Sequence, residues 1–317
     1  MSFKRIEVAV GVLSRKENDQ DYEVLVAQRV VKDRYFEKWE FPGGKLEKGE
    51  SPFSALYREL SEELEVKVLK AVPLIRLDHN YPDRSVRLHV FEVNEFSGEP
   101  HGKEGQAIRW VKPQQCAELD FLEANGPIVN AVLLPKLMLI TNIAKYGLEK
   151  TLVCINSLQQ SYGNIIVQLR ENTSDIVLLN SYKEKIEQLL SQGSFLIFNG
   201  EPSLAQELGF TGVQLGAKMA LRFARREELK FSWVGVSCHD SSELKQAEKM
   251  ADFALLSPVQ ATTSHPGQLP KGWGFFESHA ERATLPVYAL GGLCIQDCEK
   301  VRLSQGQGVA ILSAAWV

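Results

Sequence analysis

Residues 40–66 read EFPGGKLEKGESPFSALYRELSEELEV, and this stretch decides the fold of the first part of the chain. Its second half contains Glu59, Glu62 and Glu63, which follow the i, i+3, i+4 spacing of one helix face. Ser51 and Pro52 are residue types that favour the N-cap and the first position of a helix. We therefore predict a helix that begins after Ser51 and presents three carboxylates on a single face.

A second stripe of the same predicted helix is apolar and lies beside the acidic face. Such an amphipathic pattern is typical of a helix that packs one side against a core. We therefore expect this stripe to be buried. Its members are Phe53, Leu56, Tyr57, Leu60 and Leu64.

The three clustered carboxylates indicate a site for a divalent cation. Like charges one helical turn apart repel each other by ~0.2–0.5 kcal/mol per pair, and Mg²⁺, which is commonly held by carboxylates together with substrate phosphates, removes that repulsion. Arg58 is placed to orient the acids, and Gly43 and Gly44 allow the backbone to approach a metal or phosphate closely. The alternative is a solvated acidic helix face, which Glu-x-x-Glu-Glu alone does not exclude.

The complete string resembles the Nudix box, the signature of the Nudix hydrolases. That signature is Gly, five residues, Glu, seven residues, Arg-Glu-apolar-x-Glu-Glu, one residue, Gly and an apolar residue. This chain departs from it at Glu65, where the family has a Gly in a left-handed conformation, and a non-Gly residue there costs ~1 kcal/mol or more. The matching residues are Gly44, Glu50, Arg58, Glu59, Leu60, Glu62, Glu63 and Val66.

Within that family, the chain resembles the MutT-type 8-oxo-dGTP diphosphatases over residues 3–133. This resemblance implies an α+β Nudix fold for residues 1–134, with a mixed sheet between helices. It also implies Mg²⁺- or Mn²⁺-dependent hydrolysis of oxidised purine nucleoside triphosphates to a monophosphate and pyrophosphate, which cleanses the nucleotide pool and prevents mutation. The matching pieces include Ala9-Val10-Gly11, Tyr81-Pro82-Asp83-Arg84, Gly98-Glu99-Pro100, Gly102 to Gln106 and Ala124-Asn125.

The family's residue roles carry over by position. The implied catalytic residues are Glu59, Glu62, Glu63 and Arg58, and either Glu62 or Glu63 would orient the attacking water. Asn125 would hydrogen-bond the oxidised purine edge, because an amide offers both a donor and an acceptor. The implied metal ligands are Gly43 (through its carbonyl), Glu59, Glu62, Glu63 and Glu104, and the implied substrate-binding residues are Arg29, Tyr81, Asp83, Arg84 and Asn125.

Composition excludes several other classes of protein. The chain of 317 residues carries 36 Lys and Arg against 40 Asp and Glu, so its net charge of −4 gives no general attraction to nucleic acid or anionic membranes. No apolar run approaches the ~20 residues of a membrane span, and five cysteines are too few for a disulfide framework. We expect a cytoplasmic protein whose partner is a small molecule, with neither nucleic acid nor membrane involved.

The remainder of the chain, residues 135–317, indicates a (β/α)₈ TIM barrel. Short apolar runs alternate with amphipathic or polar segments, which is typical of parallel strands connected by helices. The chain stops directly after the eighth run, so the barrel could be incomplete. The eight runs are Leu137 to Thr141, Ile165 to Leu169, Phe195 to Phe198, Gly212 to Leu215, Trp233 to Val236, Phe253 to Leu256, Val287 to Leu290 and Val309 to Leu312.

Several pieces of this second half resemble thiamine phosphate synthases. The resemblance implies a phosphate-binding site on backbone N–H groups after the seventh and eighth strands, with candidates Gly291, Gly292, Ser313 and Ala314. Two carboxylates that the family uses for magnesium are missing, because Asn199-Gly200 and Ala217-Lys218 stand at those positions. The barrel therefore resembles a degenerate member of that family.

Three functions follow from these resemblances. The first is a MutT-like hydrolase joined to a degenerate barrel, which Asn125 and Tyr81 to Arg84 favour. The second is a bifunctional thiamine-pathway protein whose Nudix domain hydrolyses a thiamine-related diphosphate, which the barrel favours. The third is a nucleotide sensor without catalysis, and the intact set of three glutamates disfavours it, because a sensor has no need of a full metal site.

Overall fold

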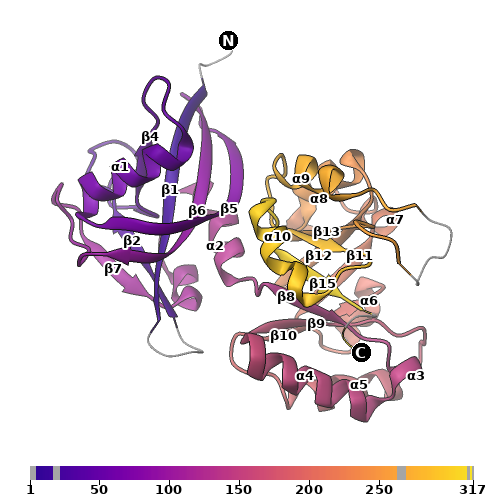
Figure 1. Cartoon of the computed structure of the whole chain (residues 1–317). Helices are drawn as coiled ribbons and strands as arrows, with labels where there is room; N and C mark the ends of the chain where they lie inside the picture. Colours follow the sequence, from indigo (N-terminus) through magenta and orange to yellow (C-terminus); the bar gives the residue numbers. More distant parts are fainter. Residues whose placement is uncertain (1–4, 17–21, 263–268, 313–314, 316–317) are drawn as a thin grey trace. The chain divides into compact units, whose positions relative to one another are not determined.

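The computed structural model describes residues 5–16, 22–262, 269–312 and 315. The chain divides into two compact units, Met1–Leu133 and Leu134–Val317. Figure 1 draws the first in indigo to magenta and the second in magenta to yellow. None of the helices in the described ranges combines the length with the apolar composition that a membrane span requires.

The first unit is built on a mixed seven-stranded sheet. β1 pairs antiparallel with β2 and parallel with β6, and β5 runs antiparallel to β6 at the edge. β3 and β7 both pair with β2, whereas the short β4 pairs with β1. The strands are β1 (Arg5–Lys16), β2 (Tyr22–Gln28), β3 (Trp39–Glu40), β4 (Gly43–Lys45), β5 (Lys67–Asn80), β6 (Ser85–Ser97) and β7 (Ile108–Val111).

Alternate residues of β1 enter two different cores, because successive side chains of a strand point to opposite faces. Ala9 and Leu13 pack with helix α1 (Pro52–Leu64), whereas Val10 and Val12 pack with helix α2 (Gly126–Leu133). The predicted mixed sheet between helices is therefore confirmed. The short helices η1 (Pro113–Glu118) and η2 (Glu123–Asn125) precede α2.

Helix α1 begins where the sequence predicts, and it ends at Glu65, the position at which the chain departs from the Nudix box. The Oγ of Ser51 accepts a hydrogen bond from the backbone N of Ser54 at 3.1 Å, as an N-cap does. Glu65 ends the helix in the left-handed conformation, with φ 59° and ψ 30°. Its backbone N–H donates to the carbonyl oxygens of Leu60 and Ser61. The chain therefore keeps the family's helix end with a residue that tolerates it less well than Gly.

The predicted apolar stripe of α1 is confirmed in its centre and wrong at its edge. Leu56, Leu60 and Leu64 are fully buried, whereas Phe53 and Tyr57 are 42% and 39% exposed. Phe53 packs on Phe91 of β6, with ring centroids 4.5 Å apart, but neither ring is enclosed by the core.

The second unit is a closed barrel of eight parallel strands. Each strand pairs with the next along the chain, and β8 and β15 close the circle by pairing with each other, so the strand circle is complete. The strands are β8 (Leu137–Ile140), β9 (Ile165–Leu169), β10 (Phe195–Asn199), β11 (Gly212–Gly216), β12 (Trp233–Cys238), β13 (Phe253–Leu256), β14 (Val287–Leu290) and β15 (Gly308–Ile311).

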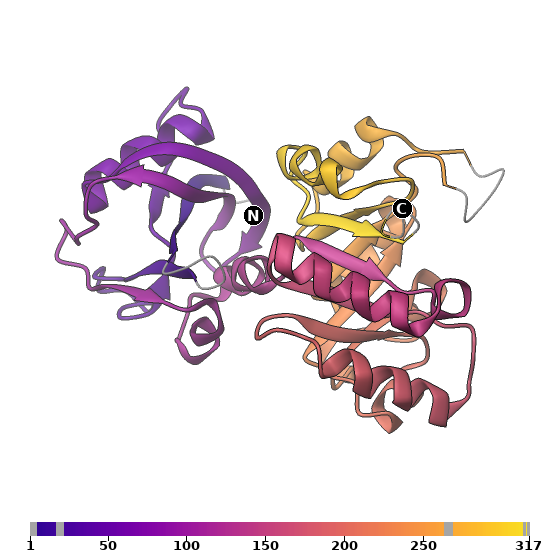
Figure 2. The same ribbon diagram turned by 60° about the horizontal axis from the view of Figure 1, so that its bottom comes forward.

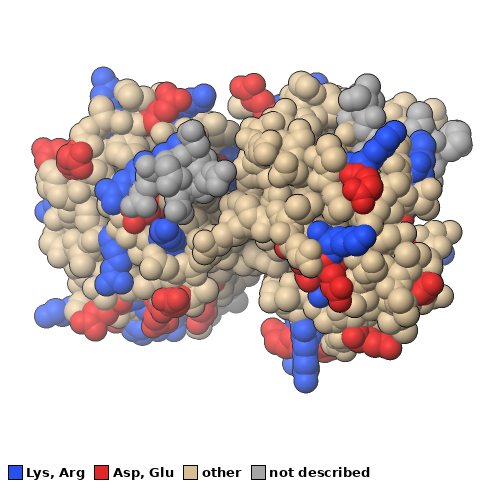
Figure 3. All heavy atoms as spheres, turned by 90° about the horizontal axis from the view of Figure 1, so that it is seen from below, with Lys and Arg blue, Asp and Glu red and all other residues tan. Residues whose placement is uncertain are grey.

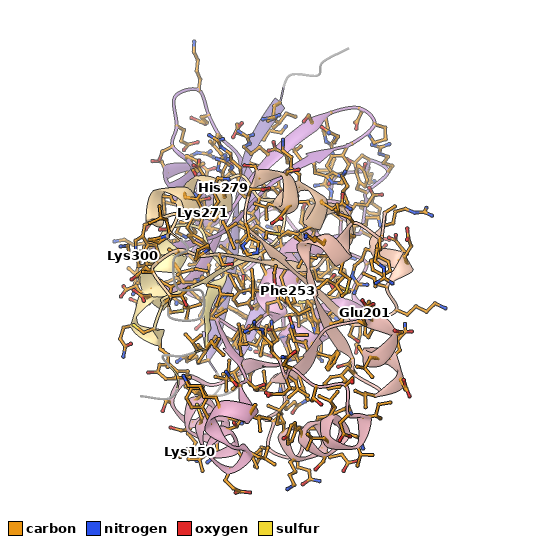
Figure 4. The ribbon with its side chains drawn as sticks, turned by 90° about the vertical axis from the view of Figure 1, so that its right-hand side faces the viewer. Lys150, Glu201, Phe253, Lys271, His279 and Lys300 are labelled. Carbon is orange, nitrogen blue, oxygen red and sulfur yellow. The ribbon has the colours of Figure 1, made fainter. Side chains whose placement is uncertain are left out.

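Helices lie outside this barrel, as Figure 2 shows. The interior is filled by side chains such as Phe253 and Tyr288, whose ring centroids lie 5.6 Å apart. In Figure 4, Phe253 lies among the strands while Lys150 and Glu201 lie at the periphery. The helices are α3 (Ile143–Tyr146), α4 (Leu148–Tyr162), α5 (Ile176–Glu187), α6 (Pro202–Glu207), α7 (Ala217–Ala220), α8 (Ser241–Met250), α9 (Trp273–Ala280) and α10 (Cys298–Leu303), with η3 (Arg226–Glu228) and η4 (Ile295–Asp297) between them.

Candidate active site

The two glycines before α1 bring the backbone against the acidic face of the helix. A Cβ atom on Gly43, whose φ is +147°, would lie 2.1 Å from the carbonyl oxygen of Ala9 in the neighbouring strand. A Cβ atom on Gly44 would lie 2.2 Å from the carboxyl carbon of Glu59. Glycine is therefore required at Gly43, where the backbone of β1 approaches. At Gly44, a side chain would instead displace the flexible carboxylate of Glu59.

Arg58 holds the acidic residues in place. Its Nε and Nη2 donate to the two carboxylate oxygens of Glu50 at 3.0 and 2.8 Å, and its Nη1 donates to Glu59 at 2.8 Å and to Glu62 at 3.1 Å. Nη2 also donates to the carbonyl oxygen of Lys45 at 3.0 Å. Hydrogen bonds to Glu50 and Glu59 raise the pKa of Arg58 above its ordinary value, so it stays charged. The orienting role that the sequence indicates agrees with this geometry.

Glu63 is a partly buried carboxylate whose negative charge is disfavoured by its surroundings. Burial, together with the nearby charge of Glu59, raises its pKa to about 8, although the backbone N–H of Gly43 donates to its Oε2 at 3.2 Å and lowers that pKa. The carboxylates of Glu104 and Glu40 raise it further. Acids that share a site destabilise each other's charged form in this way unless a cation is added.

The carboxylates around Glu63 are suitable ligands for a hard cation. In the described ranges, no three His, Cys, Asp or Glu side chains are already arranged as a metal cage. The donors are carboxylate oxygens whose mutual repulsion is unrelieved at Glu63, and such oxygens are the ligands that Mg²⁺ prefers. The resemblance to the Nudix box implies a divalent metal, typically Mg²⁺, and Glu59, Glu62, Glu63 and Glu104 are the side chains that would hold it here.

A cavity of about 450 Å³ adjoins these acids. Glu63 and Glu104 line it together with Gly43 and Gly44, so one part of its wall is acidic. Other parts of the wall come from β1, β2, β3, β6 and the segments after β2 and β5, and they include Ile6, Val8, Arg29, Glu40, Tyr81 and Arg84. The volume is in the range of small-molecule sites.

Arg29 is tied to two acids that the sequence did not single out. Its Nη1 donates to both carboxylate oxygens of Glu40 at 3.2 Å, and its Nη2 donates to Asp33 at 3.2 Å. Its buried Nε has no hydrogen-bond partner among the described residues. Burial raises the pKa of the Glu40 carboxyl above its ordinary value, and the Arg29 guanidinium opposes that rise. Glu40 opens the quoted stretch, but only folding brings it beside Arg29.

The segment after β5 supplies an aromatic and a cationic group to the cavity. The ring of Tyr81 contacts those of Tyr35 and His79, at centroid distances of 5.2 and 4.4 Å, and the guanidinium of Arg84 lies 5.1 Å from the Tyr81 centroid. Asp83 behaves differently, because its exposed carboxylate accepts a hydrogen bond from Arg34 at 2.9 Å. Tyr81 and Arg84 therefore face the cavity, whereas Asp83 lies outside its lining.

Asn125 is buried, with 4% of its surface exposed. Its Oδ1 accepts a hydrogen bond from the backbone N of Phe41 at 3.3 Å, so the residue ties η2 to the segment between β3 and β4. Leu122 from the same region lines the cavity, whereas Asn125 is not among the residues that line it.

The structure describes two of the four candidate phosphate-binding residues of the barrel. Gly291 and Gly292, directly after β14, have φ of +102° and +66°. A Cβ atom on Gly292 would lie 2.3 Å from the carbonyl oxygen of Ala261, so the loop after β13 packs closely against this turn. Ser313 and Ala314 lie outside the described residues.

The positions that lack the family's carboxylates lie at the carboxyl ends of their strands. Asn199 ends β10, and α7 begins at Ala217 directly after β11. His239 follows directly after β12, and its Nδ1 lies 3.1 Å from the carbonyl oxygen of Ser257. On the face in Figure 3, basic and acidic side chains are interspersed among larger uncharged areas.

Comparisons with known proteins match each unit separately. Residues 5–132 match the family model described as NUDIX domain, and residues 137–315 match the one described as Thiamine monophosphate synthase. An 8-oxo-dGTP diphosphatase of Escherichia coli K12 is 36% identical over 127 residues, which are 40% of this chain and 95% of that protein. A CTP pyrophosphohydrolase of the same strain is 32% identical over 129 residues, 41% of this chain and 92% of that protein.

The second unit has relatives of its own. A putative thiamine-phosphate synthase 2 of Aquifex aeolicus VF5 is 32% identical over 183 residues, which are 57% of this chain and 97% of that protein. The two sets of matches cover different residues.

Proposed function

Because the chain belongs to the Nudix family through its first domain and to the thiamine monophosphate synthase family through its second, we propose that the first domain hydrolyses 8-oxo-dGTP to 8-oxo-dGMP and pyrophosphate with Mg²⁺. The observation that carries this proposal is the acidic wall of the cavity, which Glu63 and Glu104 line beside Gly43 and Gly44 of β4. The likeness to 8-oxo-dGTP diphosphatases gives the substrate.

At the acidic wall of the cavity, the glutamates would bind the metal and Arg58 would orient two of them. Mg²⁺ bound by the carboxylates would neutralise phosphate oxygens and lower the pKa of a bound water. Arg58 holds Glu59 and Glu62 by charge-assisted hydrogen bonds, so their oxygens are already oriented when the substrate arrives. Glu62 is 60% exposed at its side chain and Glu63 is part-buried, so the two differ in their access to water. Either carboxylate would accept the hydrogen bond that orients the attacking water.

The nucleoside end of the cavity is assigned to Arg29, Tyr81, Arg84 and Asn125. Tyr81 and Arg84 offer a ring face and a guanidinium on which a base or sugar can pack. The Oδ1 of Asn125 accepts the hydrogen bond from the backbone N of Phe41. The Nδ2 amide would therefore be the donor to a carbonyl oxygen of the purine. Asp83 supports this wall through Arg34 and does not contact the nucleotide in this proposal.

A hydrolysis panel tests the proposal directly. We expect 8-oxo-dGTP to be cleaved to monophosphate and pyrophosphate with a kcat/KM at least ~100-fold above that for dGTP, since a hydrogen bond to a buried polar group discriminates strongly. The panel includes CTP, thiamine diphosphate and ADP-ribose. Equal rates for 8-oxo-dGTP and dGTP would overturn the substrate, and preference for CTP or for thiamine diphosphate would replace it.

For the barrel, we propose a phosphate-binding role without metal-dependent displacement of pyrophosphate. Asn199-Gly200 and Ala217-Lys218 supply none of the carboxylates that such chemistry needs. The Gly291-Gly292 turn keeps the close backbone that a phosphate requires. Inorganic phosphate should raise the melting temperature of the protein, and formation of thiamine phosphate from the family's two substrates would refute the proposal.

A further inference from the structure

The segment between β6 and β7 carries Glu104 and returns to the end of α1. The backbone N of Lys103 donates to the carbonyl oxygen of Glu63 at 3.0 Å, and the backbone N of His101 donates to that of Leu64 at 3.2 Å. The last carbonyl groups of a helix have no partner within the helix, so they bind other segments readily. The backbone just before Glu104 is therefore held at the end of α1, next to Glu63.

Gln106 joins the same two acids through its side chain. Its Nε2 donates to the carbonyl oxygen of Glu63 at 3.1 Å, and its Oε1 accepts from the backbone N of Glu104 at 2.8 Å. A side-chain amide can donate from its nitrogen and accept at its oxygen at the same time without carrying a charge. The side chain of Gln106 thus connects the main chain of Glu63 with the main chain of Glu104.

The segment is also shaped around Gln106. A Cβ atom on Gly102 would lie 2.0 Å from the carbonyl oxygen of Gln106, so Gly102 is required for the turn to close on it. Gln106 lines the cavity next to Glu63 and Glu104. A second contact joins the same segment to Glu65, the residue where this chain departs from the Nudix box. In it, the Nε2 of His101 lies 2.6 Å from the Oε2 of Glu65. Both side chains of that contact are more than half exposed, so it contributes little.

We propose that Gln106 is a positioning residue, which fixes Glu104 relative to Glu63 and thereby sets the affinity of the acidic wall for a divalent cation. This inference rests on the proposed function only in assigning a cation to that wall. Without the bridge, only the backbone hydrogen bonds of His101 and Lys103 would hold the Glu104 segment at α1 against the repulsion between the two carboxylates. Loss of a group that orients metal ligands weakens metal binding by ~10–100-fold.

Two variants of Gln106 and one control test this. Gln106→Leu removes both hydrogen bonds at similar volume, whereas Gln106→Asn keeps the amide but is too short to reach both partners. The control is Gln115→Leu, because the Oε1 of Gln115 accepts from the backbone N of Lys112 at 2.9 Å in η1, a bond of the same kind at a residue outside the cavity lining. Mn²⁺ affinity is measured on the full chain by the loss of the free-ion signal in electron paramagnetic resonance, with melting temperatures alongside.

We expect Mn²⁺ to bind ~10–100-fold more weakly to both Gln106 variants and unchanged to the Gln115 control. We also expect the Mg²⁺ concentration for half-maximal activity to rise by the same factor, while kcat at saturating Mg²⁺ stays within about threefold. Mn²⁺ affinity within twofold of wild type in Gln106→Leu would overturn the inference, and so would equal weakening in Gln115→Leu. If the wild type binds Mn²⁺ but cleaves no nucleotide, the proposed function fails, and the Mn²⁺ affinities still decide the role of Gln106.

Discussion

Gly44 and Glu59 are in such close contact that a Cβ atom on Gly44 would lie 2.2 Å from the Glu59 carboxyl carbon. The Gly44→Ala variant must therefore displace this carboxylate, which Arg58 holds at 2.8 Å. Because the atom in the way is the end of a flexible side chain, we expect the fold to persist. A displacement of about 1 Å at a catalytic group can cost ~100-fold in rate, and we expect a loss of that size in kcat/KM for 8-oxo-dGTP.

The matched control for this substitution is Gly126→Ala. A Cβ atom on Gly126 meets no other atom within 4 Å, and α2 starts there without a positive φ. The experiment compares the hydrolysis rate of 8-oxo-dGTP and the melting temperature between the two variants. Full activity in Gly44→Ala would show that Glu59 need not occupy its observed position.

Glu62 is the acid whose removal should separate activity from stability. Its side chain is 60% exposed and its contact with Arg58 is 3.1 Å long, so its loss should change stability by less than ~1 kcal/mol. As a ligand of the proposed metal site, it should nevertheless be indispensable for turnover, and we expect Glu62→Gln to reduce kcat by at least ~1000-fold.

A surface acid away from the cavity controls for the loss of one charge. Glu118→Gln, in η1, changes the net charge by the same amount at an exposed position. Activity is compared at saturating Mg²⁺ for both variants. If Glu62→Gln retains activity close to that of Glu118→Gln, the assignment of the metal site is wrong.

The barrel strands and α1 could be predicted from the sequence because their signals are local. Parallel strands buried on both faces read as short apolar runs, and all eight predicted runs coincide with strands β8 to β15. β3 and β4 could not be predicted in this way. They contain two and three residues, two of them glycines, and they exist only because β2 and β1 offer edges with which to pair.

The site was predictable where residues are close in sequence and not where folding brings distant ones together. The i, i+3, i+4 spacing shows that Glu59 and Glu63 share a face, but no pattern places Gln106 between Glu63 and Glu104. The pairing of Arg29 with Glu40 depends on the β2–β3 pairing in the same way. Similarly, helical spacing puts Phe53 on the apolar stripe, but it does not show that the ring stays 42% exposed in the fold.

Asp78 gives a pH-dependent contribution to stability that is independent of the site. Hydrogen bonds from Arg87, at 2.7 and 2.8 Å, hold the pKa of the Asp78 carboxyl below its ordinary value. A group whose pKa is lower in the folded state stabilises it above the unfolded pKa, and this stabilisation disappears as pH falls through the folded pKa. Asp78→Asn should therefore lower the melting temperature at pH 7, and the difference from wild type should shrink below ~pH 3.9, the unfolded value. A difference that is the same at pH 7 and pH 3 contradicts this explanation.

Glu65 ends α1 in a left-handed conformation that glycine adopts without strain. Its φ of 59° costs an L-residue about 1 kcal/mol, whereas its contact with His101 at 2.6 Å joins two largely exposed side chains and contributes less. Glu65→Gly should therefore raise the free energy of unfolding of the first domain by about 0.5–1 kcal/mol, measured by urea denaturation. Glu65→Ala separates the two effects, because it removes the contact with His101 and keeps the strained backbone. It should be slightly less stable than wild type, and a Glu65→Gly variant no more stable than Glu65→Ala would show that the helix end is not strained.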